Sequence, residues 1–136
     1  MKTQLLTFAV WMILLPVTAQ AEQYKTFGDY TVHYSAFTTD NMMPSIARSY
    51  KIPRSKNRVL VNIAIIKNQE GSFGEPVKSQ IEGTATNLSQ QLRELSMREI
   101  IEQGAIYYIA DTAVNDKETL KFNFIFTPEG ESSPYT

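Results

Sequence analysis

The chain has 136 residues, a formal net charge of -1 and no cysteine. A net charge so close to zero does not indicate any particular partner, so recognition by charge must depend on local clusters. The lack of cysteine excludes disulfides, cysteine-linked lipid anchors and a cysteine nucleophile.

The first 21 residues, MKTQLLTFAVWMILLPVTAQA, have the pattern of a secretory signal peptide. Their apolar stretch, Leu5 to Val17, would form a helix of about 20 Å, too short for a hydrocarbon core of about 30 Å. Small side chains at Ala19 and Ala21 fit a cleavage site, so we expect a mature chain of 115 residues that begins at Glu22, without stable membrane insertion. An exported domain without disulfides fits a Gram-negative periplasm, which is the localisation we predict.

The first half of the mature chain predicts one strand and one short helix. Residues 28–38 alternate, with Tyr30, Val32, Tyr34 and Ala36 on one face, as in a half-buried strand. The following stretch, DNMMPSIARSYKI at 40–52, has capping residues and a proline near its first turn. We place a short helix there.

The strongest core candidate is RVLVNIAIIK at 58–67, which is apolar on both faces apart from Asn62 and fits a central strand covered on both sides. A third strand is predicted at 77–82, before GTATNL, and two more at 105–112 and 120–127. In the last of these, Phe122, Phe124 and Phe126 share an apolar face.

The segment SQQLRELSMREIIEQG, residues 89–104, has a mixed pattern. Leu88, Leu92 and Leu95 have helical spacing, whereas Leu95, Met97 and Ile101 lie on one strand face. We favour strand, because the helical stripe stops at Leu95; a helix would make the fold α+β. The prediction is one all-β domain over residues 22–136, an antiparallel immunoglobulin-like β-sandwich with one short helix.

Four runs in order, FGDYTVHYSAFTTD, RSKNRVLVNIAIIK, GTATNL and REIIEQGAIYYIA, carry a family resemblance. The chain from Gln23 onward resembles an uncharacterised family, a domain of unknown function, of small exported periplasmic proteins of Gram-negative proteobacteria. The resemblance implies a periplasmic all-β domain and no particular catalytic or ligand residue. The chain departs from the family at Lys51, where a glycine is more usual, and in LSMREI, usually more aromatic.

The sequence contains few residues that could act in catalysis or bind a metal. His33 is the only histidine, and there is no G-x-S-x-G nucleophile motif. A soft metal could be held by His33 with Met42 and Met43, although methionine pairs more often pack in cores. An acidic turn could take calcium but lacks the spacing of an EF-hand loop; its residues are Asp111, Asn115, Asp116 and Glu118. We therefore predict no enzyme activity, no cofactor and no metal.

Five cations lie within residues 48–58, and RSKNR is the densest part. In an extended chain, Arg54, Lys56 and Arg58 would stand on one face, which we call the basic ridge. One interpretation is a solvated edge that deters sheet-to-sheet pairing, with ion pairs to Glu94 or Glu99. The other is a contact for an anionic envelope component or an acidic protein patch.

Three to five such charges contribute about 3 to 5 kcal/mol near an anionic surface, which corresponds to roughly millimolar affinity. The ridge therefore orients a partner more than it holds one. The function we predict is a noncatalytic periplasmic binding or accessory domain that acts through protein or envelope contacts, with no nucleic-acid partner. The alternative is a small-ligand or soft-metal-binding periplasmic protein.

Overall fold

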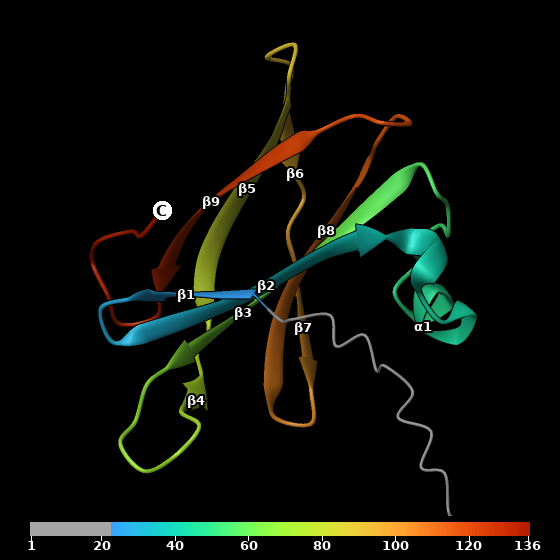
Figure 1. The fold of residues 1–136 in the computed structure, drawn as a ribbon. Coiled ribbons are helices and arrows are strands. Elements are labelled where there is room, and N and C mark those ends of the chain that lie inside the picture. The colour runs from blue at the N-terminus through green and yellow to red at the C-terminus, as the bar shows by residue number, and fades with distance from the viewer. Residues whose placement is uncertain (1–22) are drawn as a thin grey trace, which may run out of the picture.

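A computed structural model describes residues 23–136, which fold into two antiparallel β-sheets packed as a sandwich, with one short α-helix (Figure 1). The strands are β1 (Gln23–Phe27), β2 (Tyr30–Thr38), β3 (Arg58–Lys67), β4 (Glu75–Pro76), β5 (Ser79–Asn87), β6 (Leu92–Leu95), β7 (Arg98–Glu102), β8 (Ala105–Ala113) and β9 (Leu120–Pro128). The helices are the 3₁₀ turn η1 (Thr39–Asn41) and α1 (Pro44–Ser49). The predicted all-β sandwich with one short helix is confirmed.

The larger sheet has the order β1-β2-β3-β8-β7, with β4 paired to β3, and the smaller sheet has the order β6-β5-β9. The ambiguous segment 89–103 contributes β6 and β7, so the strand prediction is confirmed and the helical alternative is wrong. None of the helices among residues 23–136 has the length and apolarity that a membrane span requires.

Strand β3 is central and covered on both faces, as its sequence predicts. Val61, Ile63 and Ile65 belong to the core between the sheets, while Leu60 packs under α1 on the other face. This division follows from the two-residue period of a strand. Each fully buried aliphatic side chain contributes about 1.5 to 3 kcal/mol relative to exposure, so this strand anchors both layers.

The predicted third strand is longer than its sequence suggested, because β5 continues through Gly83 to Asn87. A glycine inside a strand usually marks a close approach, and here a β-carbon at Gly83 would lie 2.6 Å from a ring carbon of Phe124. The glycine therefore admits the Phe124 ring rather than ending the strand. Strand β1, which is largely exposed, was not predicted.

Helix α1 begins at Pro44, as expected for its first turn, and closes with a Schellman motif. The backbone N–H of Ile52 donates to the carbonyl of Ala47 at 2.8 Å, and that of Lys51 to Arg48 at 3.1 Å. Lys51 has φ 55°, the left-handed conformation that glycine adopts without strain. Buried Ile52 then packs with Leu60 and Ile109, and this contact holds the helix against the outer face of the larger sheet.

Candidate binding groove

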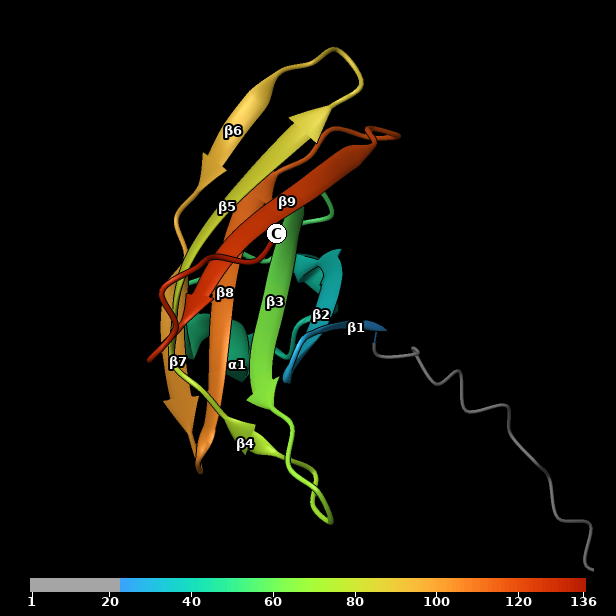
Figure 2. The same cartoon turned by 90° about the vertical axis from the view of Figure 1, so that its left-hand side faces the viewer.

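A groove of about 990 Å³ lies between the larger sheet and β9. Figure 2 shows β9 crossing in front of β3, with β2 and β1 continuing to one side. We call it the inter-sheet groove. Its lining comes from β1, β2, β3, β5, β9 and the C-terminal residue: Gln23, Lys25, Phe27, Val32, Tyr34, Ser35, Ala36, Val61, Ile63, Ile81, Phe122, Asn123, Phe124, Phe126 and Thr136.

The floor of the inter-sheet groove is apolar and aromatic. Along β2 the inward face starts buried at Tyr30 and Val32 and then becomes exposed, with Tyr34 at 38%. Ala36, the next residue along that face, is small and exposed. The two sheets therefore separate along β2, and the apolar face that a closed sandwich would bury stays accessible. Exposed apolar surface of this kind marks binding sites.

Both strands that border the groove lie at sheet edges. In the described chain β1 pairs only with β2, while β9 pairs along one side with β5. On its other side β9 exchanges two backbone hydrogen bonds with Tyr135, from Phe126 N at 3.0 Å and to Phe126 O at 2.8 Å. Because backbone groups alternate in direction along a strand, those of Phe122 and Phe124 point the same way as those of Phe126, away from β5.

An aromatic cluster closes one end of the groove. The rings of Phe27 and Phe126 lie edge to face at 5.3 Å, and Tyr135 stacks on Phe126 at 5.3 Å. Tyr30 donates a 2.9 Å hydrogen bond from its hydroxyl to Glu131. Burial, reinforced by this bond and by the Glu131 charge, raises the pKa of Tyr30. The cluster fixes the C-terminal segment against β9.

The groove carries little charge. Among the described residues that line it, Lys25 has the only charged side chain, and its ammonium lies 4.8 Å from the centre of the Phe27 ring. A cation over an aromatic face is favourably placed, because the ring face carries partial negative charge. The site therefore offers apolar contacts with one positive charge at its rim.

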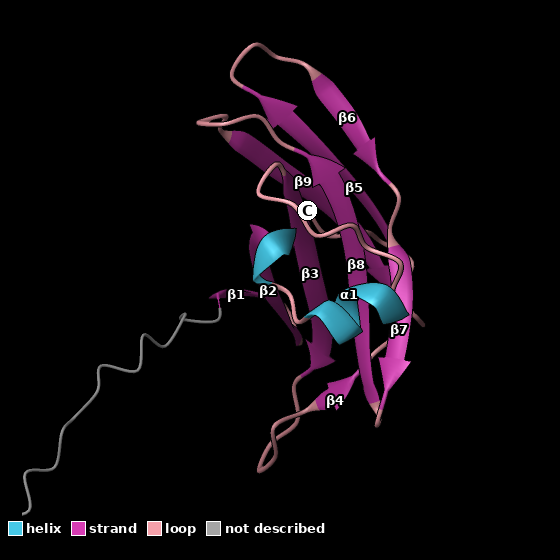
Figure 3. Ribbon diagram, turned by 90° about the vertical axis from the view of Figure 1, so that its right-hand side faces the viewer, coloured by secondary structure: helices cyan, strands magenta, loops and turns pink. Residues whose placement is uncertain are grey.

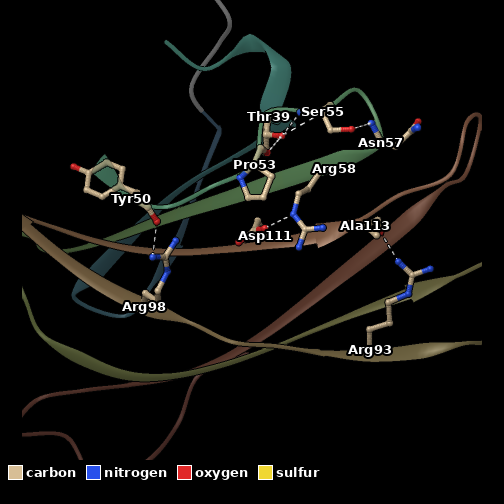
Figure 4. Close-up of polar contacts among 10 residues, drawn as sticks. All are labelled: Thr39, Tyr50, Pro53, Ser55, Asn57, Arg58, Arg93, Arg98, Asp111 and Ala113. Atoms are coloured by element: carbon tan, nitrogen blue, oxygen red, sulfur yellow. Dashed lines mark hydrogen bonds and ion pairs between the residues drawn. The ribbon is translucent and has the colours of Figure 1, made fainter. Parts of the chain in front are cut away.

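The basic ridge is not one extended face, because Lys56 and Asn57 form a turn before β3 begins. Arg54 donates to the backbone carbonyl of Asp40 at 2.7 Å, and Arg58 pairs with Asp111 on β8 (Figure 4). Lys56 is exposed at the tip of the turn. Two of the three predicted cations thus make contacts within the chain, and neither contact is the predicted pairing with Glu94 or Glu99.

Buried Thr39 shapes the segment that carries these cations. Its hydroxyl donates to the carbonyl of Pro53 at 2.7 Å and accepts from the backbone N–H of Ser55 at 2.9 Å (Figure 4). The hydroxyl of Ser55 in turn accepts from the backbone N–H of Asn57 at 3.0 Å. These bonds hold residues 53–57 in a loop, which is why the alternation in RSKNR does not become a strand.

The other candidate ligand sets are separated or engaged. Met42 is buried beneath α1, whereas its neighbour Met43 is 64% exposed. His33 lies on β2 with its ring 6.0 Å from that of Tyr24. Across residues 23–136, no group of three or more histidine, cysteine, aspartate or glutamate side chains is arranged to hold a metal ion.

The acidic turn before β9 is tied to arginines. Glu118 accepts from Arg93 at 3.3 Å and from Asn115 at 3.0 Å, and Asp111 pairs with Arg58. An arginine beside each of these two carboxylates opposes cation binding there, because it already supplies the positive charge. The turn therefore acts as a structural junction.

A second, smaller pocket of about 310 Å³ lies beneath α1. Phe37, Met42, Leu60 and Ile109 are among its apolar walls, and Asn62 contributes a polar group. Tyr50, also in its lining, donates a hydrogen bond to Glu102, and this bond is the main reason that the pKa of Tyr50 is raised.

These features define a two-sheet antiparallel sandwich that opens along the β1 and β9 edges. The chain belongs to the DUF4426 family, described as a domain of unknown function, which it matches over residues 24–136. It is similar to the crystal structure of a DUF4426 family protein from Pseudomonas aeruginosa PAO1, with a TM-score of 0.71 and 30% identity over 86% of this chain and 91% of that one. No curated protein matches the chain.

The family resemblance seen in the sequence is therefore confirmed as an uncharacterised domain family. Export stays a prediction, because residues 1–22 lie outside the described part of the chain. The proteobacterial range of the family also stays a prediction. The inter-sheet groove was missed by sequence reasoning. The one sequence feature that could have indicated it is the change along β2 from the large residues Tyr30, Val32 and Tyr34 to small Ala36. Alternation alone assigns all four residues to a buried face.

Proposed function

We propose that this protein is an exported, noncatalytic binding or accessory domain of the periplasm that holds a polypeptide partner in the inter-sheet groove. The observation that carries the proposal is the exposed apolar floor beside the β9 edge. A binding domain that acts through protein contacts needs an accessible apolar surface or a strand edge, and the groove offers both.

The lining of the groove supports binding over catalysis. Among its described residues only Lys25 and Tyr34 carry titratable side chains. General acid–base and nucleophilic mechanisms need converging titratable groups within hydrogen-bond reach of each other. Apolar and aromatic side chains instead favour the burial of a partner's surface.

A small apolar ligand is the second candidate. The groove volume of about 990 Å³ lies at the upper end of the range typical of small-molecule sites, about 300 to 1,000 Å³. The pocket beneath α1 adds a smaller space of about 310 Å³. The open form of the groove and its strand edge favour the polypeptide.

Export is the part of the proposal that rests on sequence alone. A short apolar run followed by Ala19-Gln20-Ala21 is typical of a cleaved signal peptide. Intact mass of the protein from a periplasmic extract is expected to show a chain that begins at Glu22. Retention of residues 1–21 in a membrane fraction would contradict export with cleavage.

The basic ridge has at most a steering role in this proposal. Lys56 is exposed, while Arg54 and Arg58 make contacts within the chain. Charges of this kind raise association rates with an acidic partner or an anionic envelope component at low salt more than they raise affinity.

Site-directed photocrosslinking tests the binding function in cells. A benzophenone amino acid at Tyr34 is expected to crosslink one partner whose attached peptide mass spectrometry can identify, whereas the same probe at exposed Ala113 is not. Ala36→Trp, which fills the groove, should abolish the Tyr34 adduct, and Ala113→Trp is the matched control. The absence of an adduct at Tyr34, or equal adducts at both positions, would count against the proposal.

A further inference from the structure

We infer that the groove takes its partner as an extended strand added to the free edge of β9, an inference that rests on the proposed function. The partner is a polypeptide segment with apolar side chains at alternate positions and an acidic residue nearby. Its backbone would pair with Phe122 and Phe124, beyond the position that Tyr135 occupies.

The backbone of β9 supplies the pairing groups. Phe126 and Tyr135 exchange both their N–H and C=O groups, so Phe126 directs both groups away from β5. The same orientation recurs two and four residues earlier, at Phe124 and Phe122. Along this part of the described chain β9 has no second strand beside it. An exposed edge of this kind is a template for strand addition.

The C-terminal segment already binds this edge in the manner we infer. Tyr135 lies antiparallel to Phe126 as a single bridge. The next residue, Thr136, lines the groove. A partner strand in the same direction would continue the ladder, with one residue opposite Phe124 and another opposite Phe122. The bridge between Tyr135 and Phe126 therefore indicates the register in which a partner strand would pair with β9.

The groove determines which side chains the added strand would carry. Alternate side chains of a strand face the same side, so every second residue would enter the groove against the β9 phenylalanines and the exposed part of β2. Lys25 on β1 provides the one charged side chain of the described lining and favours a carboxylate. Polar side chains on the opposite face would remain in water.

Charge also argues against a second copy of this chain as the occupant. Lys25 lies on the β1 edge and exposed Lys121 on the β9 edge. Lysines on edge strands deter pairing between identical sheets, because like charges are brought together. An acidic partner segment turns the same lysines into favourable contacts.

Amide hydrogen exchange on the folded mature protein tests strand addition. The probe is a capped seven-residue peptide of alternating valine and threonine between terminal glutamates. At saturating peptide, exchange of the Phe122 and Phe124 amides is expected to slow at least tenfold. The amides of Asn123 and Ile125, which point toward β5, are internal controls and should change little.

Two controls separate the backbone from the side chains. The same peptide N-methylated at the amides that face β9 keeps its side chains but loses its donors, and should bind at least tenfold more weakly. Ala36→Trp should weaken the unmodified peptide by a similar factor, while Ala113→Trp should not. Circular dichroism and thermal unfolding establish that both variants are folded.

Each contrary result identifies a different occupant. Equal binding of the N-methylated peptide, or unchanged exchange at both amides, would overturn strand addition while the proposed binding function stands. Protection that rises with protein concentration and without peptide would point to a second copy. Binding of lauric acid that Ala36→Trp blocks, without any peptide binding, would point to a small apolar ligand and overturn both the inference and the polypeptide proposal.

Discussion

The two sides of the sandwich are closed in different ways. Figure 3 shows β6 running into β7 along one side, so a single stretch of chain passes from the smaller sheet to the larger. On the other side β1 and β9 are separate edges, and the inter-sheet groove lies between them. Covalent continuity holds the first side together, whereas an aromatic cluster closes only one end of the second.

Packing follows the same division. On the closed side Leu95 is 8% exposed and packs with Ala85 and Ala110. Arg93 reaches from β6 to the backbone carbonyl of Ala113 at the end of β8 (Figure 4). On the open side Tyr34 is 38% exposed. Packing is therefore tighter around Leu95 than around Tyr34, and the ring of Tyr34 stays accessible to a partner.

Matched truncations should show the largest difference. Leu95→Ala removes a buried side chain and leaves a cavity, so we expect a loss of about 2 to 4 kcal/mol in the free energy of unfolding. Tyr34→Ala removes a half-exposed ring from the groove and should cost about 1 kcal/mol or less. Urea denaturation measures both. Equal losses would show that the groove side is packed as firmly as the other.

Tyr108 joins the sheets on the closed side, and removal of its hydroxyl should have an intermediate effect. The hydroxyl accepts from the backbone N–H of Ser79 at 2.7 Å and donates to Glu99 at 3.0 Å. Tyr108→Phe would leave a partly buried donor and acceptor without their partner, at a cost of about 1 to 2 kcal/mol. Urea denaturation at pH 7 measures the loss, and an unchanged midpoint would contradict a structural role for this bridge.

The same residue predicts alkaline sensitivity. Burial, assisted by the hydrogen bond from Tyr108 to Glu99, raises the pKa of Tyr108 in the folded chain above its ordinary value of 10.0. The folded state then holds its proton at pH values where the unfolded state has lost it. This stabilising contribution is complete below about pH 10 and is lost as the pH rises through the folded pKa. Tyr108→Phe should flatten that decline.

The sequence predicts the layers of this fold better than it predicts the site. Period-two alternation and the apolar run of β3 suffice to place the main strands, because burial of one or both faces determines which residues alternate. The predicted end of β5, before Gly83, was wrong. In the sequence, a glycine that makes room for the Phe124 ring cannot be distinguished from a glycine that ends a strand.

The groove depends on a relation between strands far apart in sequence. Alternation places Tyr34 and Ala36 on the inward face of β2, but whether that face meets the other sheet depends on how far β9 and β5 extend across it. The basic ridge failed as an extended face for a local reason. The hydroxyl of Thr39 fixes the carbonyl of Pro53 and the N–H of Ser55, and so bends the chain.

A substitution on neither side of the sandwich should leave the difference in stability between Leu95→Ala and Tyr34→Ala unchanged. Lys51 has φ 55° at the end of α1, where the family resemblance implies glycine. Lys51→Gly relieves the left-handed strain and should raise the free energy of unfolding by about 0.5 to 1 kcal/mol. When Lys51→Gly is combined with Leu95→Ala or with Tyr34→Ala, it should raise the free energy of unfolding of each variant by the same amount, because the effects of distant substitutions are additive. A destabilising effect would show that the lysine side chain is needed there.

The smallest effect is expected at Lys56, which lies on the turn into β3 and takes no part in closing either side. Arg54 and Arg58 bind within the chain, but exposed Lys56 stands at the tip of the turn. Lys56→Glu should therefore change the free energy of unfolding by no more than about 0.5 kcal/mol in urea denaturation. A loss of 2 kcal/mol or more would mean that the ammonium is buried and paired.

The same variant separates a steering role from a purely structural turn. If the ridge guides an acidic partner toward the protein, Lys56→Glu should slow capture of that partner at low salt, and added salt should slow wild-type capture in the same way. Arg58→Gln is the comparison, because it breaks a pair with Asp111 and should lower stability as well as charge. Capture by Lys56→Glu that is unchanged and insensitive to salt would leave the turn only its solvated, edge-protecting role.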